Sequence, residues 1–338
     1  MATSHQPPQF PAGKPKVVVT RHLMPSVEAR MSELFETVLN PDDTPLTQDQ
    51  LVAAMRDCDV LVPTVTDKIT KDIIDAAGER LGLIASFGAG TEHIDLAAAA
   101  EKRILVTNTP GVFTDDTADI AMAAIIGVPR RIREGTQLVR RGEWTGWAPS
   151  GLLGRKLGGK VLGIVGMGRI GQAVAHRARA FGLEIAYTNR KRLPEAVESM
   201  LSARFVEDVD ALVAQSDILT LHCPLTPETR GLMDARRIAL MKPGASLINT
   251  ARGELIDQDA LIEALHYGDL AGAGLDVYPD EPNVARGLLD HPNVMTLPHI
   301  GSATAEGREA SGEKVVANIR FWADGHRPPD QVLTALIS

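Results

Sequence analysis

The fold is decided by the stretch Val161–Gly171, which reads VLGIVGMGRIG. Its first five residues are apolar or glycine and predict a buried strand, and the helical pattern GQAVAHRARAFG begins at its last glycine. A strand joined to a helix by G-x-G-x-x-G is typical of a site for a dinucleotide pyrophosphate. Gly166 would allow the tight turn, Gly168 the close approach of the pyrophosphate, and Gly171 the packing of the helix on the strand.

The residues that open this helix complete the predicted phosphate site. Arg169 and Ile170 lie at its start, where free N–H groups and the positive end of the helix dipole attract an anion. A tight turn without any ligand would also use glycines. The position between a predicted strand and a predicted helix favours dinucleotide binding over that alternative.

The end of the next predicted strand, Glu184–Thr188, distinguishes NAD from NADP. Enzymes that use NAD usually carry Asp or Glu about 20 residues after the glycines, where the carboxylate accepts hydrogen bonds from the ribose 2′-hydroxyl. Here Asn189 stands at that place, and an amide tolerates a 2′-phosphate that a carboxylate would repel. The segment therefore predicts NADP(H) as the preferred cofactor, with NAD(H) as the second candidate and a solvated basic loop as the alternative. The cations that would attract the phosphate are Arg190, Lys191 and Arg192.

Short apolar runs alternate with helical patterns on both sides of this stretch. Near-continuous apolar strands separated by helices are typical of parallel sheets covered on both faces, so we predict an α/β protein. The remaining predicted strands are Val17–Thr20, Asp59–Val65, Leu81–Gly88, Ile104–Asn108, Asp217–Cys223, Ser246–Thr250, Ala271–Val277 and Val294–Pro298.

Helical patterns occupy the gaps between these runs. Ser26–Glu36 and Thr47–Asp57 predict helices, the second with a Thr N-cap. A helix is predicted from about residue 114 to 133, with Pro129 kinking or ending its last turn, and another from about 304 to 324. Gly142–Gly159, rich in Gly and Trp, predicts a long irregular connector of the kind that is usually functional or interfacial.

Length and composition limit the class of protein. The 338 residues suggest two domains, and 44% hydrophobic with 23% charged residues is ordinary for a soluble protein. The net charge of -8 argues against a nucleic-acid or anionic-membrane surface, which would show a basic excess. The two cysteines, Cys58 and Cys223, suit neither a disulfide framework nor a metal site. We therefore expect a cytoplasmic protein without a bound metal.

Neither a membrane span nor a targeting segment is expected. The longest apolar stretch, Ile120–Val128, is about half of the roughly 20 residues that a transmembrane helix needs. Residues 1–15 have no apolar core and contain prolines at positions 7, 8, 11 and 15, which predicts an extended, loose leader.

Three further segments follow predicted strands, where ligands bind in open α/β sheets. Together with the glycine stretch they resemble the D-isomer-specific 2-hydroxyacid dehydrogenase family over almost the whole chain after the leader. Within it the sequence is most similar to the glyoxylate/hydroxypyruvate reductases. The segments are Asn249–Gly253 (NTARG), Leu275–Pro282 (LDVYPDEP) and Leu297–Thr304 (LPHIGSAT), supported by Cys223–Thr226 (CPLT) and Trp144–Pro149 (WTGWAP).

The resemblance implies a catalytic triad. Arg252 matches the arginine whose fork holds the substrate carboxylate and carbonyl oxygens. His299 matches the general acid that protonates the carbonyl oxygen as hydride reaches the carbon. Glu281 matches its partner, which stabilises the imidazolium. Each alone could be an ordinary surface residue, but all three lie just beyond predicted strand ends.

The resemblance also assigns binding residues. The backbone amides of Ala89 and Gly90 would bind the substrate carboxylate, for which an ordinary tight turn is the alternative. Trp144 would either line the partner subunit's substrate pocket or act as a buried interface anchor. The residues implied in cofactor binding are Thr117, Cys223, Pro224, Asp276 and Gly301, with Asp276 accepting a hydrogen bond from the nicotinamide carboxamide.

The implied layout is two Rossmann-like or flavodoxin-like parallel-sheet domains, one of them discontinuous. Residues 16–107 and 300–338 would form the substrate-binding domain, and residues 108–299 the dinucleotide-binding domain. The site would lie in a cleft that closes by a hinge. The implied assembly is a homodimer through the cofactor domains, acting on a small 2-oxo acid.

The implied activity is NADPH-dependent reduction of glyoxylate to glycolate and of hydroxypyruvate to D-glycerate. Formate dehydrogenases of this superfamily carry Gln at the place of Glu281, and phosphite dehydrogenases carry a Lys that SFGAGTEHIDL lacks. A short form of phosphoglycerate dehydrogenase remains an alternative. A second is a dinucleotide-sensing corepressor that binds partner peptides and turns over no metabolite.

Overall fold

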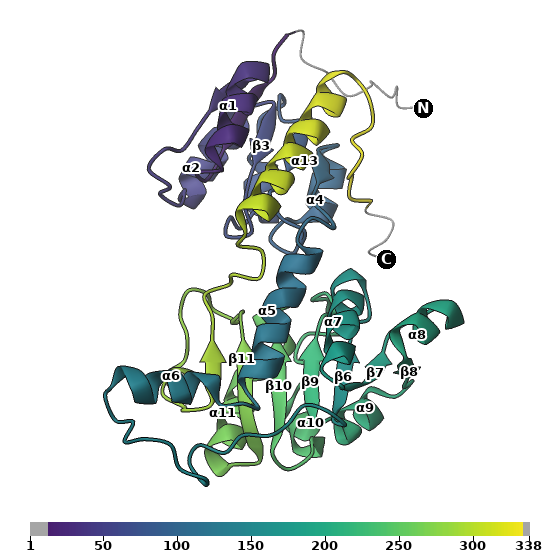
Figure 1. Ribbon diagram of the computed structural model, residues 1–338. Helices are drawn as coiled ribbons and strands as arrows, with labels where there is room; N and C mark the ends of the chain where they lie inside the picture. Colours follow the sequence, from purple (N-terminus) through teal and green to yellow (C-terminus); the bar gives the residue numbers. More distant parts are fainter. Residues whose placement is uncertain (1–12, 334–338) are drawn as a thin grey trace. The chain divides into compact units, whose positions relative to one another are not determined.

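The computed structural model describes residues 13–333, so most of the predicted leader 1–15 lies outside the described residues. The chain divides into two compact units (Figure 1). The first unit comprises the described residues up to Phe113 together with those from Ala303 onward, and the second is Thr114–Ser302. The domain boundaries predicted from the sequence lie after residues 107 and 299.

The first unit is a five-stranded parallel sheet in the order β2-β1-β3-β4-β5. This order reverses direction between β1 and β3, where open α/β sheets bind ligands at the carboxyl ends of the strands. Its strands are β1 (Lys16–Val19), β2 (Glu36–Val38), β3 (Val60–Val62), β4 (Leu83–Ala85) and β5 (Leu105–Thr107). Its helices are α1 (Pro25–Leu34), α2 (Gln48–Asp57), α3 (Lys71–Asp75), α4 (Leu96–Glu101) and α13 (Ala305–Ala323).

Helices cover both faces of this sheet, as the alternating apolar strands require. Val60 and Val62 of β3 face α1 and α13, with which they share a buried core that includes Trp322. Leu61, between them, joins a second core with α2, α3 and α4. The predicted N-cap of α2 is confirmed, because the Thr47 hydroxyl accepts a hydrogen bond from the Gln50 amide.

The second unit is a seven-stranded parallel sheet in the order β12-β11-β10-β9-β6-β7-β8. Its strands are β6 (Val161–Val165), β7 (Glu184–Thr188), β8 (Ala203–Phe205), β9 (Ile218–Leu221), β10 (Ala245–Asn249), β11 (Leu270–Leu275) and β12 (Val294–Thr296). Its helices are α5 (Thr114–Gly127), α6 (Ile132–Arg140), α7 (Arg169–Ala180), α8 (Glu195–Leu201), α9 (Val209–Gln215), α10 (Ala235–Leu240), α11 (Gln258–Tyr267) and α12 (Arg286–Leu289), with a 3₁₀ turn at Gly253–Leu255.

This sheet is also covered on both faces. Ile248 of β10 packs in a core with α5 and α7, whereas its neighbour Leu247 packs in the other core with α9, α10 and α11. The chain starts in the middle of the sheet at β6, adds β7 and β8 on one side, and returns to β9 on the other. The switch point therefore lies beside β6, and the glycine loop follows this strand.

The predicted α/β class and parallel sheets are confirmed, and most differences are local. The helix predicted over 114–133 ends at Gly127, two residues before Pro129, and α6 begins at Ile132. The edge strands β2 and β8 were not predicted, because neither has an apolar run that marks it. The connector Gly142–Gly159 contains no helix or strand, as expected. None of the helices within residues 13–333 has both the length and the apolar character needed to cross a membrane.

Candidate active site

The glycine loop, Gly166–Gly171, is tightly packed at its two ends and has free space beside Gly168. Gly166 has φ 95°, and a Cβ there would lie 2.6 Å from the amide nitrogen of Cys223. A Cβ on Gly171 would lie 2.3 Å from the carbonyl oxygen of Gly166. Apart from the chain neighbours of Gly168, no atom of the described residues lies within 4 Å of the corresponding position on this glycine, the N-cap of α7. The loop thus has space on its open side beside a helix N-terminus, which fits a pyrophosphate.

Asn189 is bonded to this loop. Its Oδ1 accepts a hydrogen bond of 2.8 Å from the amide of Met167 and so ties the end of β7 to the turn after β6. From the sequence, Asn189 was interpreted only as the replacement of an acid. Its contact with the loop was missed because G-x-G-x-x-G carries no signal for what the residue at the end of β7 binds.

The three cations after Asn189 are not equivalent. Arg192 donates to the buried carboxylate of Glu198 through Nε at 3.0 Å and Nη2 at 2.8 Å. The Tyr187 hydroxyl donates to the same carboxylate at 2.6 Å, and the hydrogen bonds from Arg192 and Tyr187 hold the Glu198 pKa below its usual value. Arg190 and Lys191 are exposed and form no ion pair within the part of the chain that the structure describes.

The strands β10, β11 and β12 are neighbours, so their carboxyl ends share one edge of the sheet. At the end of β10, the side chain of Asn249 makes two hydrogen bonds. Its Nδ2 donates to the backbone carbonyl of Arg252 at 2.7 Å, and its Oδ1 accepts from the backbone amide of Ala251 at 3.0 Å. A Cβ on Gly253 would lie 2.0 Å from the backbone carbon of Tyr278. Glycine at position 253 therefore lets the Arg252 turn contact the loop that follows β11.

His299 and Glu281 form a hydrogen-bonded pair at this edge. His299 Nδ1 lies 2.7 Å from Glu281 Oε2, and Glu281 Oε1 accepts from the Tyr278 amide at 3.0 Å. Burial opposes ionisation of Glu281, but these two hydrogen bonds and the charge of Arg252 lower its pKa below the usual value. His299 has φ 55°, in the left-handed region that a non-glycine residue rarely adopts, which points to a functional constraint.

Asp276 fixes the segment that carries His299. Its carboxylate accepts from the amides of Ile300 at 2.8 Å and Gly301 at 2.7 Å. Burial raises the Asp276 pKa, and the two amides act in the opposite direction. The Thr117 hydroxyl donates to the carbonyl of Gly301 at 2.9 Å, which joins α5 to the same segment. Three residues implied in cofactor binding are thus in contact with one another.

The other histidines of interest have different surroundings. His222 Nε2 lies 2.9 Å from the Thr220 hydroxyl, and burial lowers the His222 pKa to about 4. His93 Nε2 lies 3.2 Å from the Ser86 hydroxyl in the first unit. His299 differs from His222 in that its ring is paired with a carboxylate, whereas His222 is held in a site where burial lowers its pKa.

Cys223 and Pro224 follow β9, and the backbone of Cys223 lies close to Gly166 of the glycine loop. Burial raises the pKa of the Cys223 thiol to about 11, so it stays protonated near neutral pH. This agrees with a wall position and opposes a nucleophilic role. Within residues 13–333, no group of three or more His, Cys, Asp or Glu side chains is arranged to hold a metal ion.

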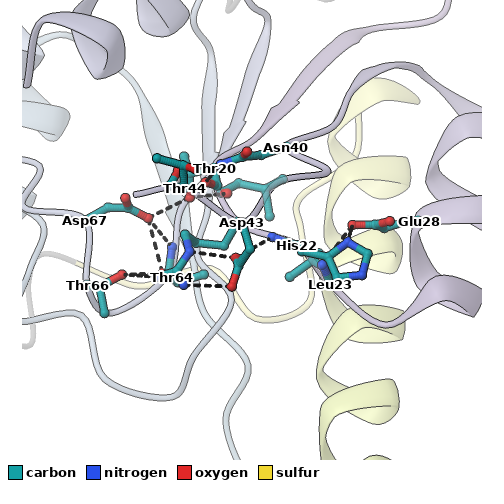
Figure 2. Close-up of polar contacts among 12 residues, drawn as sticks. Thr20, His22, Leu23, Glu28, Asn40, Asp43, Thr44, Thr64, Thr66 and Asp67 are labelled. Atoms are coloured by element: carbon teal, nitrogen blue, oxygen red, sulfur yellow. Dashed lines mark hydrogen bonds and ion pairs between the residues drawn. The ribbon is translucent and has the colours of Figure 1, made fainter. Parts of the chain in front are cut away.

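In the first unit, Ala89 and Gly90 lie in the loop after β4. The preceding Phe87 amide donates to the carbonyl of Pro63 at 2.8 Å and so links this loop to the end of β3. The end of β3 is itself tied to β1. The Asp67 carboxylate accepts from the Thr20 hydroxyl at 2.6 Å and the Thr64 amide at 2.7 Å, in the polar cluster of Figure 2.

Trp144 lies in the connector and is 59% exposed in the single chain, and Trp147 is 84% exposed. Two apolar residues of the preceding α6, Ile132 and Val139, are 50% and 61% exposed. The single chain thus leaves a group of large apolar side chains in contact with solvent at α6 and the connector.

Comparisons with known proteins show the family to which the chain is similar. Residues 122–301 match the family model described as D-isomer specific 2-hydroxyacid dehydrogenase, NAD binding domain. A glyoxylate reductase of Thermococcus litoralis is 45% identical over 94% of this chain and 97% of its own length. A glycerate dehydrogenase of Hyphomicrobium methylovorum is 38% identical over 88% of this chain and 92% of its own. The crystal structure of an NADPH-dependent glyoxylate/hydroxypyruvate reductase from Sinorhizobium meliloti, in complex with NADP and malonate, has a TM-score of 0.85 and 34% identity, covering 95% of this chain and 97% of that one.

Proposed function

The chain belongs to the D-isomer-specific 2-hydroxyacid dehydrogenase family, and from this premise we propose that it uses NADPH to reduce glyoxylate to glycolate and hydroxypyruvate to D-glycerate. The observation that carries the proposal is the 2.7 Å pair of His299 and Glu281, at the same sheet edge as Arg252. Relatives named glyoxylate reductase and glycerate dehydrogenase support this substrate class.

We assign proton transfer to His299. Its Nδ1 faces the Glu281 carboxylate, which leaves Nε2 to donate a proton to the carbonyl oxygen of the substrate. Because the Glu281 pKa is lowered, Glu281 remains a carboxylate that stabilises the imidazolium before transfer. Arg252 would bind the carboxylate and carbonyl oxygens and so hold the reacting carbon in place.

We assign cofactor binding to the second unit, whose range nearly coincides with the match to the family model. When bound, the nicotinamide cofactor supplies the hydride. Asp276 can still accept a hydrogen bond from the carboxamide, because each carboxylate oxygen has two lone pairs. The pyrophosphate would be bound by Gly166, Gly168, Arg169, Ile170 and Gly171, and the remaining wall formed by Thr117, Cys223, Pro224 and Gly301.

The preference for NADPH over NADH rests on the segment after β7. An aspartate at position 189 would accept the same hydrogen bond from Met167, so this contact does not account for asparagine in place of aspartate. The missing negative charge does account for it, because asparagine does not repel a 2′-phosphate. We infer that Arg190 and Lys191 contribute most of the attraction and that Arg192, already paired with Glu198, contributes less.

We assign substrate binding to the first unit through the amides of Ala89 and Gly90. We also propose a homodimer in which a second copy of the chain covers the exposed apolar residues of α6 and the connector. Trp144 would then be either a buried interface anchor or a wall of the partner's substrate pocket. A Trp144→Ala variant that stays dimeric in light scattering but shows a raised KM would support the second role. We further propose a cytoplasmic location.

Initial rates test the proposal most directly. Glyoxylate, hydroxypyruvate, pyruvate and phenylpyruvate are each compared with NADPH and NADH. We expect the highest kcat/KM with glyoxylate or hydroxypyruvate and NADPH, whereas a preference for NADH contradicts the interpretation of residues 189–192. Phosphohydroxypyruvate is measured as a fifth substrate, and highest activity with it would favour a short phosphoglycerate dehydrogenase. Dinucleotide binding without turnover of any 2-oxo acid would favour a corepressor.

A further inference from the structure

The loop that contains Ala89 and Gly90 is held by contacts to its carbonyl oxygens. Gly88 O accepts a hydrogen bond of 2.9 Å from the amide of Thr109. Ala89 O accepts one of 2.7 Å from the side-chain Nδ2 of Asn108. Both donors lie in the segment that directly follows β5, the strand paired with β4. Asn108 is thus a side chain that holds the tip of this loop.

These carbonyl contacts also set the direction of the amides. In a planar trans peptide the C=O and N–H bonds point in opposite directions. Binding of Ala89 O by Asn108 therefore directs the N–H of Gly90 away from Asn108, and binding of Gly88 O by Thr109 does the same for the N–H of Ala89. Within the described residues, neither of these two N–H groups donates to another group of the protein.

Asn108 is itself held in place. Its backbone amide donates to the carbonyl of Asp330 at 3.3 Å. The Asp330 carboxylate accepts from Lys314 of α13 at 3.0 Å. The next residue, Thr109, accepts a hydrogen bond of 2.9 Å at its hydroxyl from Ser311, also in α13. The donor that orients the loop is therefore anchored to the longest helix of the unit.

From these contacts we propose that Asn108 is a positioning residue for substrate binding, because it orients the Gly90 amide toward the carboxylate of the 2-oxo acid. The inference rests on the proposed function, which assigns Ala89 and Gly90 to that carboxylate. Asn108 does not touch the substrate. It acts through the peptide group between residues 89 and 90.

The test compares Asn108→Ala and Asn108→Asp with the wild-type protein. Both variants lose the donor to Ala89 O, and the aspartate keeps the size of the side chain while it repels that carbonyl. Because one hydrogen bond contributes about 1 kcal/mol, we expect KM for glyoxylate and hydroxypyruvate to rise about five- to tenfold. We expect kcat and the KM for NADPH to change less than about twofold, because neither depends on the loop.

Asn40→Ala is the matched control. Asn40 lies in the same unit, and its Nδ2 also donates to backbone carbonyls, those of Thr20 and Thr44, each at 2.8 Å (Figure 2). A general loosening of the unit would raise KM in this variant as well, whereas the proposal expects an unchanged KM. An equal rise in the Asn40 variant, or no rise in either Asn108 variant, overturns the proposal.

Binding of oxalate to the protein with NADPH, measured by calorimetry, separates this inference from the proposed activity. Oxalate presents a carboxylate but accepts no hydride, so its Kd reports on the loop without turnover. Tight binding by the wild type, weakened about fivefold by Asn108→Ala, supports the role of Asn108 even if no 2-oxo acid is reduced. A wild-type protein that reduces glyoxylate while its Asn108 variants bind oxalate normally contradicts the inference and leaves the activity intact.

Discussion

The carboxyl edge of the second unit's sheet carries charged side chains in two places that are built in opposite ways. At the ends of β11 and β12, Asp276 and Glu281 are bonded to backbone amides, and Glu281 is bonded to His299 as well. At the end of β7, on the other side of the switch point, Arg190 and Lys191 are exposed. A group that transfers a proton needs a fixed geometry, whereas a cation that attracts a phosphate acts through its charge.

The largest effect should follow substitution of the proton donor. We expect His299→Ala to lower kcat by about 10²- to 10⁴-fold, because general acid catalysis contributes that much. NADPH binding, followed by the change in cofactor fluorescence, should stay within about twofold, since the pyrophosphate loop is untouched. A variant that retains a tenth of the wild-type kcat would exclude His299 as the acid.

A smaller loss of kcat is expected when His299 is kept but its charged partner, Glu281, is replaced. Glu281→Gln preserves the size of the side chain and a hydrogen-bonding oxygen for the Tyr278 amide. It removes the charge that stabilises the imidazolium, so we expect kcat to fall about 10- to 100-fold. Steady-state rates from pH 5 to 9 measure this.

The acid stability of the same variant provides its control. The Glu281 pKa is lowered in the folded protein, so the carboxylate stabilises the fold above its usual value of 4.5. This contribution is lost as the pH falls through the folded-state pKa. Urea unfolding at several pH values should show the difference between wild type and Glu281→Gln shrinking below about pH 4.5. A difference that grows in acid would contradict the assigned shift.

The two places also differ in how far the sequence predicts them. The strands β6 and β7 were predicted with their observed bounds, because buried parallel strands form continuous apolar runs. Arg252, Glu281 and His299 were proposed from motif resemblance, and the structure supplies the contacts of each. The close approach at Gly253 and the amides bound by Asp276 depend on which loops meet in the folded chain. No local pattern encodes those contacts.

For the segment after β7, the sequence predicted the charges but not which of them is already paired. The sequence predicted that all three cations attract the phosphate, but a buried glutamate six residues beyond Arg192 binds that side chain. The sequence NRKRLPEAVE does not reveal this, because the helix α8 must first place Glu198 beneath the loop. Composition therefore overestimates the number of free charges.

The exposed cations should determine cofactor choice without affecting chemistry. For Arg190→Ser combined with Lys191→Ser, we expect KM for NADPH to rise about 10- to 30-fold, because each lost charge–phosphate contact costs about 1 kcal/mol in an exposed site. The KM for NADH and both kcat values should hardly change. Rates with each cofactor at low and high salt measure this. An equal rise for NADH would mean that these residues shape the loop instead of recognising the phosphate.

The smallest effect on kinetics is expected at Arg192. This residue shares exposure with Arg190 and Lys191, and it shares a fixed side-chain contact with the residues at the ends of β11 and β12. Arg192 is exposed like its neighbours, but it is paired with the buried carboxylate of Glu198, so we expect it to behave as a structural residue. Arg192→Ala leaves Glu198 with the Tyr187 hydroxyl as its one side-chain donor among residues 13–333, which should lower the thermal midpoint by a few degrees. The KM should rise no more than about threefold, and by the same factor for NADPH and NADH, because a shifted loop affects the ribose of both.

A selective loss of NADPH affinity would instead show that pairing with Glu198 orients Arg192 toward the phosphate without neutralising it. The double variant with Glu198→Gln tests the structural role, because it removes the carboxylate charge that Arg192→Ala leaves without its cation. The thermal midpoint should recover in the double variant if the buried charge causes the instability.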